Sequence, residues 1–121
     1  MPTARELIAQ TRLAQPDKYY IRMAGGILDW EEQIGAKTIK VKGWEDCDFF
    51  AHWSRGEPYR HVTEGHTGKS VVTRGTLKEA KDVLSAALDA MGQDAFADAV
   101  VQAIFDTGLS PRYEWVKEEQ T

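Results

Sequence analysis

The stretch from Asp48 to Thr73 constrains the fold of this chain most, because it alternates with a period of two and is broken by two turn sequences. The turns are residues 55–58 (RGEP) and 65–68 (GHTG), whose glycines and proline are typical of loops between strands. We therefore predict three antiparallel strands. If each turn is a four-residue loop, His52 faces His61 on the neighbouring strand.

The two faces of these strands differ in chemistry. The same pairing places Glu64 opposite Lys69 and Val62 opposite Val71, and a slip of one residue would exchange the two faces. One face is mostly apolar, which predicts that it belongs to the core, and the other mixes aromatic and polar side chains. The apolar face contains Phe49, Ala51, Trp53, Val62 and Val71 with Arg60 near its rim, and the second contains Phe50, His52, Tyr59, His61, Thr63, Ser70 and Val72.

Two helices follow the strands, and each carries start and stop signals. Thr76 followed three residues later by Glu79 is a capping-box pattern, and Gly92 is a typical stop for the helix that it begins. A second helix is predicted from about residue 94 to 107, with Gly108 as its stop. Apolar residues recur at spacings of three and four, so we expect inward-facing stripes of Leu77, Ala80, Leu84, Ala87, Leu88 and Met91, and of Phe96, Val100, Ala103 and Ile104.

The amino-terminal part is less regular. Thr3 and Glu6 repeat the capping-box pattern and predict a helix that Pro16 ends. Residues 18–23 resemble a strand, a turn is expected at the glycines of residues 25–26, and residues 37–42 alternate as an edge strand does, with lysines on the solvent side. Residues 27–34 fit a short helix and an irregular crossing equally, so their structure stays open.

These patterns predict an α+β fold: an antiparallel sheet of about four strands, a C-terminal helix pair packed on one face, and an N-terminal helix alongside. A length of 121 residues with 42% hydrophobic content fits a single domain over residues 1–121. The sequence shows no apolar run of bilayer-spanning length and no signal-peptide pattern, and its lone cysteine, Cys47, cannot form an internal disulfide. We therefore expect a cytoplasmic protein with no membrane association.

Charge is unevenly distributed along the chain. Residues 52–75 carry four basic and two acidic side chains, a net charge of +2, whereas residues 76–121 carry four basic and nine acidic side chains, a net charge of −5. This balance argues against general affinity for nucleic acid. The order of helix, three strands and a helix opening with residues 78–81 (KEAK) resembles a double-stranded RNA-binding domain, but Glu79 and Asp82 offset the lysines, so no residue roles are transferred.

Two motifs resemble known sites only in part. Residues 65–70 (GHTGKS) end like a phosphate-binding loop, yet the earlier glycine of that motif is Thr63 here and residues 71–73 predict a strand instead of a helix. Metal-ligand residue types occur at Cys47, His52, His61 and His66, but their spacing brings only His52 and His61 to the same place. We expect no metal ion and no cofactor.

The candidate binding surface is the aromatic, histidine- and arginine-containing hairpin. Aromatic and arginine side chains are typical of the centres of protein interfaces. We therefore predict a small binding protein without catalytic activity that contacts a protein partner or a second copy of itself, as in a homodimer. One alternative is a histidine-dependent, metal-assisted enzyme using His52 or His61 with Asp48 or Glu57, and another is a module for single-stranded nucleic acid. The predicted binding residues are His52, Trp53, Arg55, Tyr59, Arg60 and His61.

Overall fold

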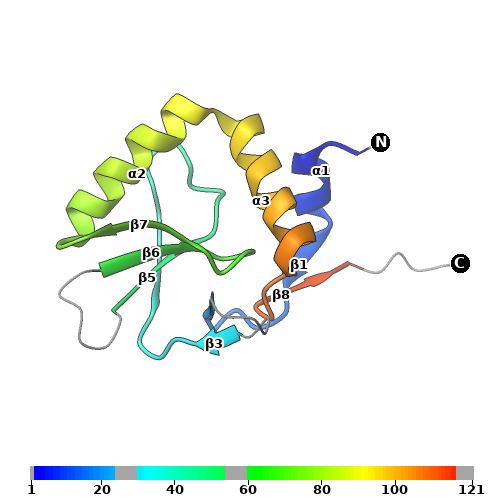
Figure 1. The fold of residues 1–121 in the computed structure, drawn as a ribbon, viewed down its shortest axis with the longest axis horizontal. Coiled ribbons are helices and arrows are strands. Elements are labelled where there is room, and N and C mark those ends of the chain that lie inside the picture. The colour runs from blue at the N-terminus through cyan, green and yellow to red at the C-terminus, as the bar shows by residue number, and fades with distance from the viewer. Residues whose placement is uncertain (1, 24–29, 54–59, 117–121) are drawn as a thin grey trace, which may run out of the picture.

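The computed structural model describes residues 2–23, 30–53 and 60–116. Its strands form three antiparallel sheets: a four-stranded sheet in the order β4-β5-β6-β7, and the two-stranded ribbons β1-β8 and β2-β3 (Figure 1). The fold is therefore α+β, as the sequence predicted. The elements are α1 (Ala4–Ala9), β1 (Thr11–Leu13), β2 (Tyr20–Arg22), β3 (Trp30–Glu32), β4 (Lys37–Ile39), β5 (Phe49–Trp53), β6 (Arg60–Glu64), β7 (Ser70–Arg74), α2 (Leu77–Met91), α3 (Gln93–Thr107) and β8 (Tyr113–Trp115).

The pairing between β5 and β6 follows the predicted register. His52 lies opposite His61 and Ala51 lies opposite Val62. Strand β4 pairs with β5 at the edge of the sheet, which confirms the edge strand predicted there. The odd-numbered positions of β5 thus face one layer of the protein and the even-numbered positions face the other.

The predicted register between β6 and β7 is correct next to the turn, where Thr63 pairs with Ser70, and is wrong by one residue from Val62 onward. A β-bulge after Val62 places Val72, not Val71, opposite Val62. The bulge inserts one extra residue into β7, and it therefore reverses the faces on which the two valines lie. Val72 is buried in the core, whereas Val71 is 38% exposed. A period-two pattern cannot reveal such a bulge, because both neighbours are valine.

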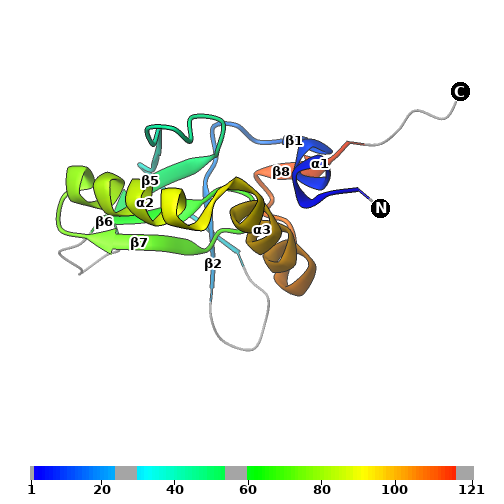
Figure 2. The ribbon, with the colours of Figure 1, turned by 90° about the horizontal axis from the view of Figure 1, so that it is seen from above.

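Helix α2 covers one face of the four-stranded sheet (Figure 2). Its start is capped by the Thr76 hydroxyl, which accepts a hydrogen bond from the backbone N–H of Glu79 at 3.2 Å, and Gly92 follows its end with a φ of +87°. Of the predicted stripe, Leu77, Ala80, Leu84 and Leu88 pack against the sheet, whereas Ala87 and Met91, which were expected to face inward, are exposed. Packing of the inward residues against the sheet creates the core. Its buried members are Ile39, Val41, Trp44, Phe49, Ala51, Val62, Val72, Ala80, Leu84 and Leu88.

Helix α3 turns away from α2 and packs against both α2 and α1 (Figure 1). Phe96 connects it to the core, because its ring lies 5.7 Å from that of Trp44 and 5.8 Å from that of Phe49. The predicted N-terminal helix ends earlier than expected, at Ala9 instead of near Pro16. The chain after Ala9 forms β1, which pairs with β8, so long-range strand pairing outweighs local helix propensity here.

The second face of the sheet is covered as well. The Tyr19 ring lies 5.1 Å from that of Phe50, and Phe50 is fully buried although the sequence placed it on the more polar face. The β2-β3 ribbon reaches the sheet at Gly68, whose carbonyl accepts a hydrogen bond from the Arg22 N–H. A β-carbon at Gly68 would lie 2.5 Å from the Trp30 ring, so this close approach requires glycine.

Within the described ranges, no helix combines the length and the apolar character that crossing a membrane would require.

The bulge makes a prediction about two neighbouring valines. Replacing Val72 with alanine should lower the free energy of unfolding by about 2 kcal/mol, because buried methyl groups are lost and a cavity remains. Replacing Val71 with alanine should change it by less than about 0.5 kcal/mol, since its side chain is on the surface. Urea denaturation of both variants measures the difference. If Val71→Ala lowers the free energy of unfolding more than Val72→Ala does, the bulge is contradicted and the register predicted from the sequence is supported.

Candidate functional site

The predicted binding residues do not share one face. Trp53, Arg60 and Arg74 are aligned across β5, β6 and β7 on the face that carries the core residues, at the end of the sheet beyond the core. We call these three residues the Trp53 row. The Arg60 guanidinium lies over the Trp53 ring, 4.8 Å from its centroid, and Trp53 remains 50% exposed.

The histidines lie on the opposite face. The rings of His52 and His61 stack with 5.3 Å between centroids. His52 Nε2 lies 2.8 Å from the hydroxyl of Thr63, and His61 Nδ1 lies 3.0 Å from the hydroxyl of Thr73. His52 is buried, so its side chain does not share a surface with Trp53.

Two of the six predicted residues, Arg55 and Tyr59, lie outside the described residues. For the other four, the structure separates Trp53 and Arg60 from His52 and His61. This separation follows from the alternation of side chains along a strand, which sends adjacent residues to opposite faces.

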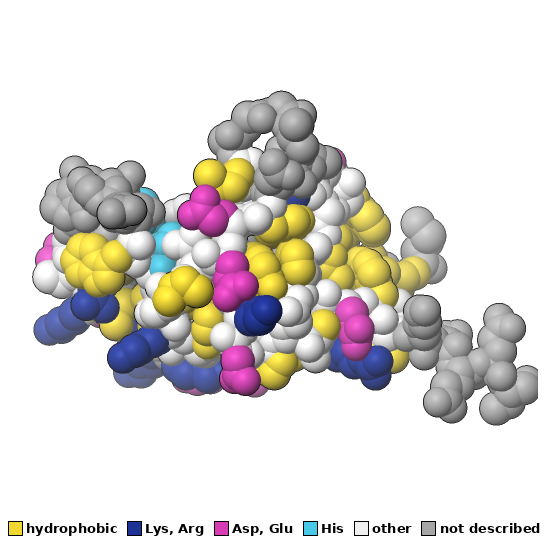
Figure 3. All heavy atoms as spheres, turned by 90° about the horizontal axis from the view of Figure 1, so that it is seen from below, with side chains coloured by type: hydrophobic (Ala, Val, Ile, Leu, Met, Phe, Trp, Pro, Cys, Tyr) yellow, Lys and Arg dark blue, Asp and Glu magenta, His cyan; other side chains and the backbone are white. Residues whose placement is uncertain are grey.

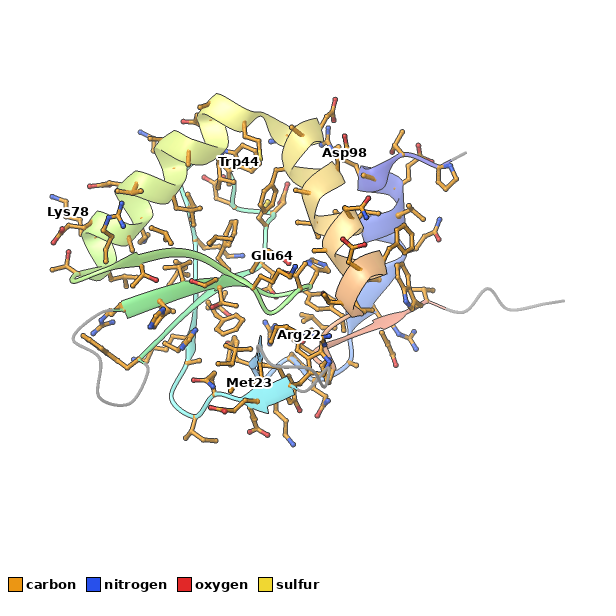
Figure 4. The ribbon with its side chains drawn as sticks, in the orientation of Figure 1. Arg22, Met23, Trp44, Glu64, Lys78 and Asp98 are labelled. Carbon is orange, nitrogen blue, oxygen red and sulfur yellow. The ribbon has the colours of Figure 1, made fainter. Side chains whose placement is uncertain are left out.

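Basic side chains gather around the Trp53 row. Figure 3 shows hydrophobic and basic side chains side by side at the end of the molecule where β5 and β6 meet, with histidine next to them. Lys78, in the first turn of α2, lies at the same end (Figure 4). Among the described residues, no carboxylate forms an ion pair with Arg60 or Arg74.

A second polar region, which the sequence did not single out, surrounds the turn at residues 65–68. The Glu64 carboxylate accepts hydrogen bonds from the backbone N–H groups of His66 and Thr67 at 2.9 and 2.8 Å. It also pairs with His66 Nδ1 at 2.7 Å. The Glu64 side chain is only 4% exposed and that of His66 12%, so this acid–imidazole pair is largely shielded from water.

The Glu64–His66 pair adjoins a buried ionic cluster. Asp48 accepts hydrogen bonds from Arg112 Nε at 2.9 Å and from the Tyr113 hydroxyl at 2.7 Å. Burial lowers the pKa of Arg112, but its hydrogen bond and charge attraction to Asp48 raise it by more. Burial, and then the charge of Asp48, raise the pKa of Tyr113. The ring of Tyr113 stacks on that of His66 at 3.9 Å, so the two polar groups form one continuous region.

Gly65 allows this cluster to form. A β-carbon at this position would lie 1.8 Å from Asp48 Oδ2, so any larger residue would displace the carboxylate that Arg112 and Tyr113 hold. The N–H of Gly65 also donates to the backbone carbonyl of Asp48 at 2.8 Å. The turn that resembled a phosphate-binding loop is thus a junction where distant segments of the chain meet.

A cavity of about 230 Å³ lies beside this region, between α1, α3 and the loop that precedes β5. Cys47, Asp48, Glu64 and His66 line it together with apolar residues of α3. Burial, and then the nearby charge of Glu64, raise the pKa of the Cys47 thiol to about 11. Cys47 is therefore a neutral thiol at physiological pH, which makes it a poor nucleophile.

One of the two carboxylates predicted to serve the histidines of an enzyme, Glu57, lies outside the described residues. Asp48, which was expected to serve His52 or His61, instead holds Arg112 and Tyr113. Among the described residues, no three His, Cys, Asp or Glu side chains are grouped so that they could hold a metal ion. Arg112 is the only arginine in the acidic stretch of residues 76–121, and this isolation was the one sequence signal for the cluster.

The buried guanidinium should dominate the stability of this region. Replacing Arg112 with methionine leaves the Asp48 carboxylate buried without its cation, and should lower the free energy of unfolding by about 3–5 kcal/mol. Replacing Arg12, whose side chain is 63% exposed and pairs with Glu114, with glutamine should cost less than about 1 kcal/mol. Urea denaturation compares the two. Equal losses would show that the buried pair does not stabilise the fold more than a surface pair does.

The raised pKa of Cys47 predicts slow alkylation. At pH 8 the folded protein should react with iodoacetamide about 100-fold more slowly than the urea-unfolded protein, because the reactive thiolate is scarce. The contribution of the thiol to stability is complete below the unfolded pKa and decreases as the pH rises toward 11. Intact-mass kinetics between pH 7 and about 11 measure the alkylation rate, and urea denaturation over the same range measures the stability. An alkylation midpoint near pH 8.5 in the folded protein would contradict the burial of Cys47.

No protein-family model, curated protein or solved structure matches this chain.

Proposed function

We propose that this chain is a binding protein without catalytic activity, and that the Trp53 row binds an acidic segment of a partner protein. The observation that supports the proposal most is the half-exposed indole of Trp53 beneath the guanidinium of Arg60. A large aromatic ring buries much apolar surface when a partner covers it, which favours binding. It also loses little conformational entropy.

The charges around the row favour an acidic partner. Arg60 and Arg74 lie opposite each other on β6 and β7, and Lys78 lies at the same end of α2. Two arginines on adjacent strands repel each other in the unbound protein. A carboxylate placed between them would relieve that repulsion and form charge-assisted hydrogen bonds with both.

A protein partner fits better than a nucleic acid. A phosphate chain needs an extended basic track, whereas residues 76–121 carry a net charge of −5 and include both long helices. These helices would repel a long polyanion that continued past the row. A short acidic segment with one or two carboxylates would contact the row without crossing the acidic helices.

The proposal is tested with a synthetic twelve-residue peptide in which Asp and Glu flank a central Leu. In NMR titrations of the ¹⁵N-labelled chain, the Trp53 indole N–H should shift saturably as the peptide is added. Arg60→Gln combined with Arg74→Gln should weaken binding by about tenfold or more, because both charge-assisted contacts are lost. Trp53→Ala should have an effect of similar size.

The matched control is Lys42→Gln combined with Lys69→Gln, which removes the same charge from exposed positions at the other end of the sheet. This variant should bind the peptide within about twofold of the parent chain. If both double variants bind the peptide equally weakly, the net charge of the protein explains the loss. That result would overturn the assignment of the Trp53 row as the binding site. If the chain binds an oligothymidylate more tightly than the peptide, single-stranded nucleic acid, and not a protein, is the partner.

Sedimentation velocity of the chain alone tests whether it forms a homodimer. A dimer that dissociates on Arg60→Gln and Arg74→Gln would identify the acidic partner as a second copy, whose α2 and α3 carry exposed aspartates. A dimer that persists in that variant would use another surface and would count against the row as the self-association site.

A further inference from the structure

Glu64 and His66 line the cavity, and together they offer a hydrogen-bond acceptor to a ligand. Three donors converge on the Glu64 carboxylate, and the imidazole Nδ1 of His66 is one of them. A carboxylate that already accepts two backbone N–H groups acts as an acceptor here, so Nδ1 carries the proton. In the neutral imidazole the second ring nitrogen, Nε2, is a lone-pair acceptor, and among the described residues none hydrogen-bonds to it.

Two sets of contacts fix the orientation of the His66 imidazole. Its ring stacks on that of Tyr113 at 3.9 Å, and the Tyr113 hydroxyl is in turn fixed by Asp48 at 2.7 Å. Backbone bonds of the same turn add to this, since the His66 carbonyl accepts from the N–H of Ser110 at 2.9 Å. An acceptor held this firmly loses little entropy when a ligand binds.

One part of the cavity wall is apolar. Trp44 and Phe96 meet edge to face at 85° on one side, and Figure 4 shows Trp44 and Glu64 both on the inner side of the arch formed by α2 and α3. Aromatic faces attract cations as well as apolar groups. The apolar lining consists of Ile8, Trp44, Phe96, Ala97 and Val100.

The rim of the cavity is acidic. Glu45 and Asp46 are exposed there, and the backbone N–H of Gly43 lowers the pKa of Glu45, which favours its carboxylate form. The one basic residue of the lining, Arg5, lies 3.8 Å from Asp94 on α3. The rim thus retains an excess of negative charge, which raises the local concentration of cations.

We propose that this cavity binds a small organic ammonium ion with an apolar group, whose N–H donates to His66 Nε2 while the apolar group lies against Trp44 and Phe96. The volume of about 230 Å³ limits the ligand to roughly a single ring with a short chain, because pockets that hold drug-sized ligands have volumes of about 300 Å³ or more. This ligand site is separate from the Trp53 row, and the two proposals stand or fall independently.

Phenethylammonium is a suitable probe, and 2-phenylethanol, which is similar in size but uncharged, is its control. Titration of the ¹⁵N-labelled full chain should shift the Trp44 indole N–H and the Cys47 amide saturably with phenethylammonium, and at least about tenfold more weakly with the alcohol. Equal affinities would overturn the assignment of an ammonium ligand, and no saturable shift with either compound would overturn the site.

Three variants separate the contributions of volume, acceptor and charge. Ala97→Leu fills the cavity and His66→Phe keeps the ring on Tyr113 but removes the acceptor, so each should abolish measurable binding. Glu45→Gln with Asp46→Asn should weaken binding about fivefold to tenfold by removing the acidic rim. Because Glu45 and Asp46 are exposed, this double variant should fold normally even if the two core variants do not.

The matched control for the rim is Asp82→Asn with Asp106→Asn, which makes the same change of net charge at exposed positions of α2 and α3 outside the cavity lining. Phenethylammonium should bind to this control within about twofold of the parent chain. If the control and the rim variant weaken binding equally, the cation is attracted by the whole protein and the cavity is not its site.

Discussion

The buried ion pair between Arg112 and Asp48 connects parts of the chain that are far apart in sequence. Arg112 is 3% exposed, and its Nη1 donates to the backbone carbonyls of Pro16 at 2.6 Å and Lys18 at 3.0 Å while Nε and Nη2 hold Asp48. A guanidinium in this position offsets its loss of hydration because nearly every N–H has a partner. One side chain thus joins the C-terminal segment to the N-terminal segment and to the start of β5.

The turn at residues 65–68 completes that junction and links it to both candidate sites. Glu64 caps the turn, Gly65 permits the approach of Asp48, and Gly68 receives the β2-β3 ribbon. Strand β6, which ends in this turn, begins with Arg60 at the opposite end of the sheet. The proposed ligand cavity and the Trp53 row therefore lie at the two ends of one strand, and each is supported by a different set of side chains.

The two surfaces differ in the physical basis of recognition. At the Trp53 row, Arg60 is half-buried and Arg74 is exposed, so salt screens their charges, and in the proposed complex they would contribute mainly to the rate and selectivity of association. At the cavity, Glu64 and His66 are largely shielded from water and hydrogen-bonded to each other, so their positions are set before any ligand would bind. An open surface of the first kind suits a protein segment, and a concave site of the second kind suits a small molecule.

Local sequence patterns were sufficient for the elements whose signals are local. Thr76, Gly92 and Gly108 bound the two long helices, and the alternation in residues 49–64 sets the pairing of β5 with β6, because capping and period two act over a few residues. The lengths of the terminal elements were not predictable in this way. The stretch after Ala9 becomes β1 because β8, about a hundred residues later, pairs with it.

Of the candidate sites, the sequence by itself determined the aromatic and basic composition of the hairpin and the opposition of His52 and His61. The alternation also placed Trp53 and Arg60 on one face and the two histidines on the other, as the structure confirms. Only the tertiary structure decided that His52 is buried while Trp53 stays half exposed. It also decided that Glu64 and His66 border a cavity beside Asp48 and Arg112. The reason is that burial and charge pairing arise between segments distant in sequence, and neither composition nor periodicity records which segments will meet.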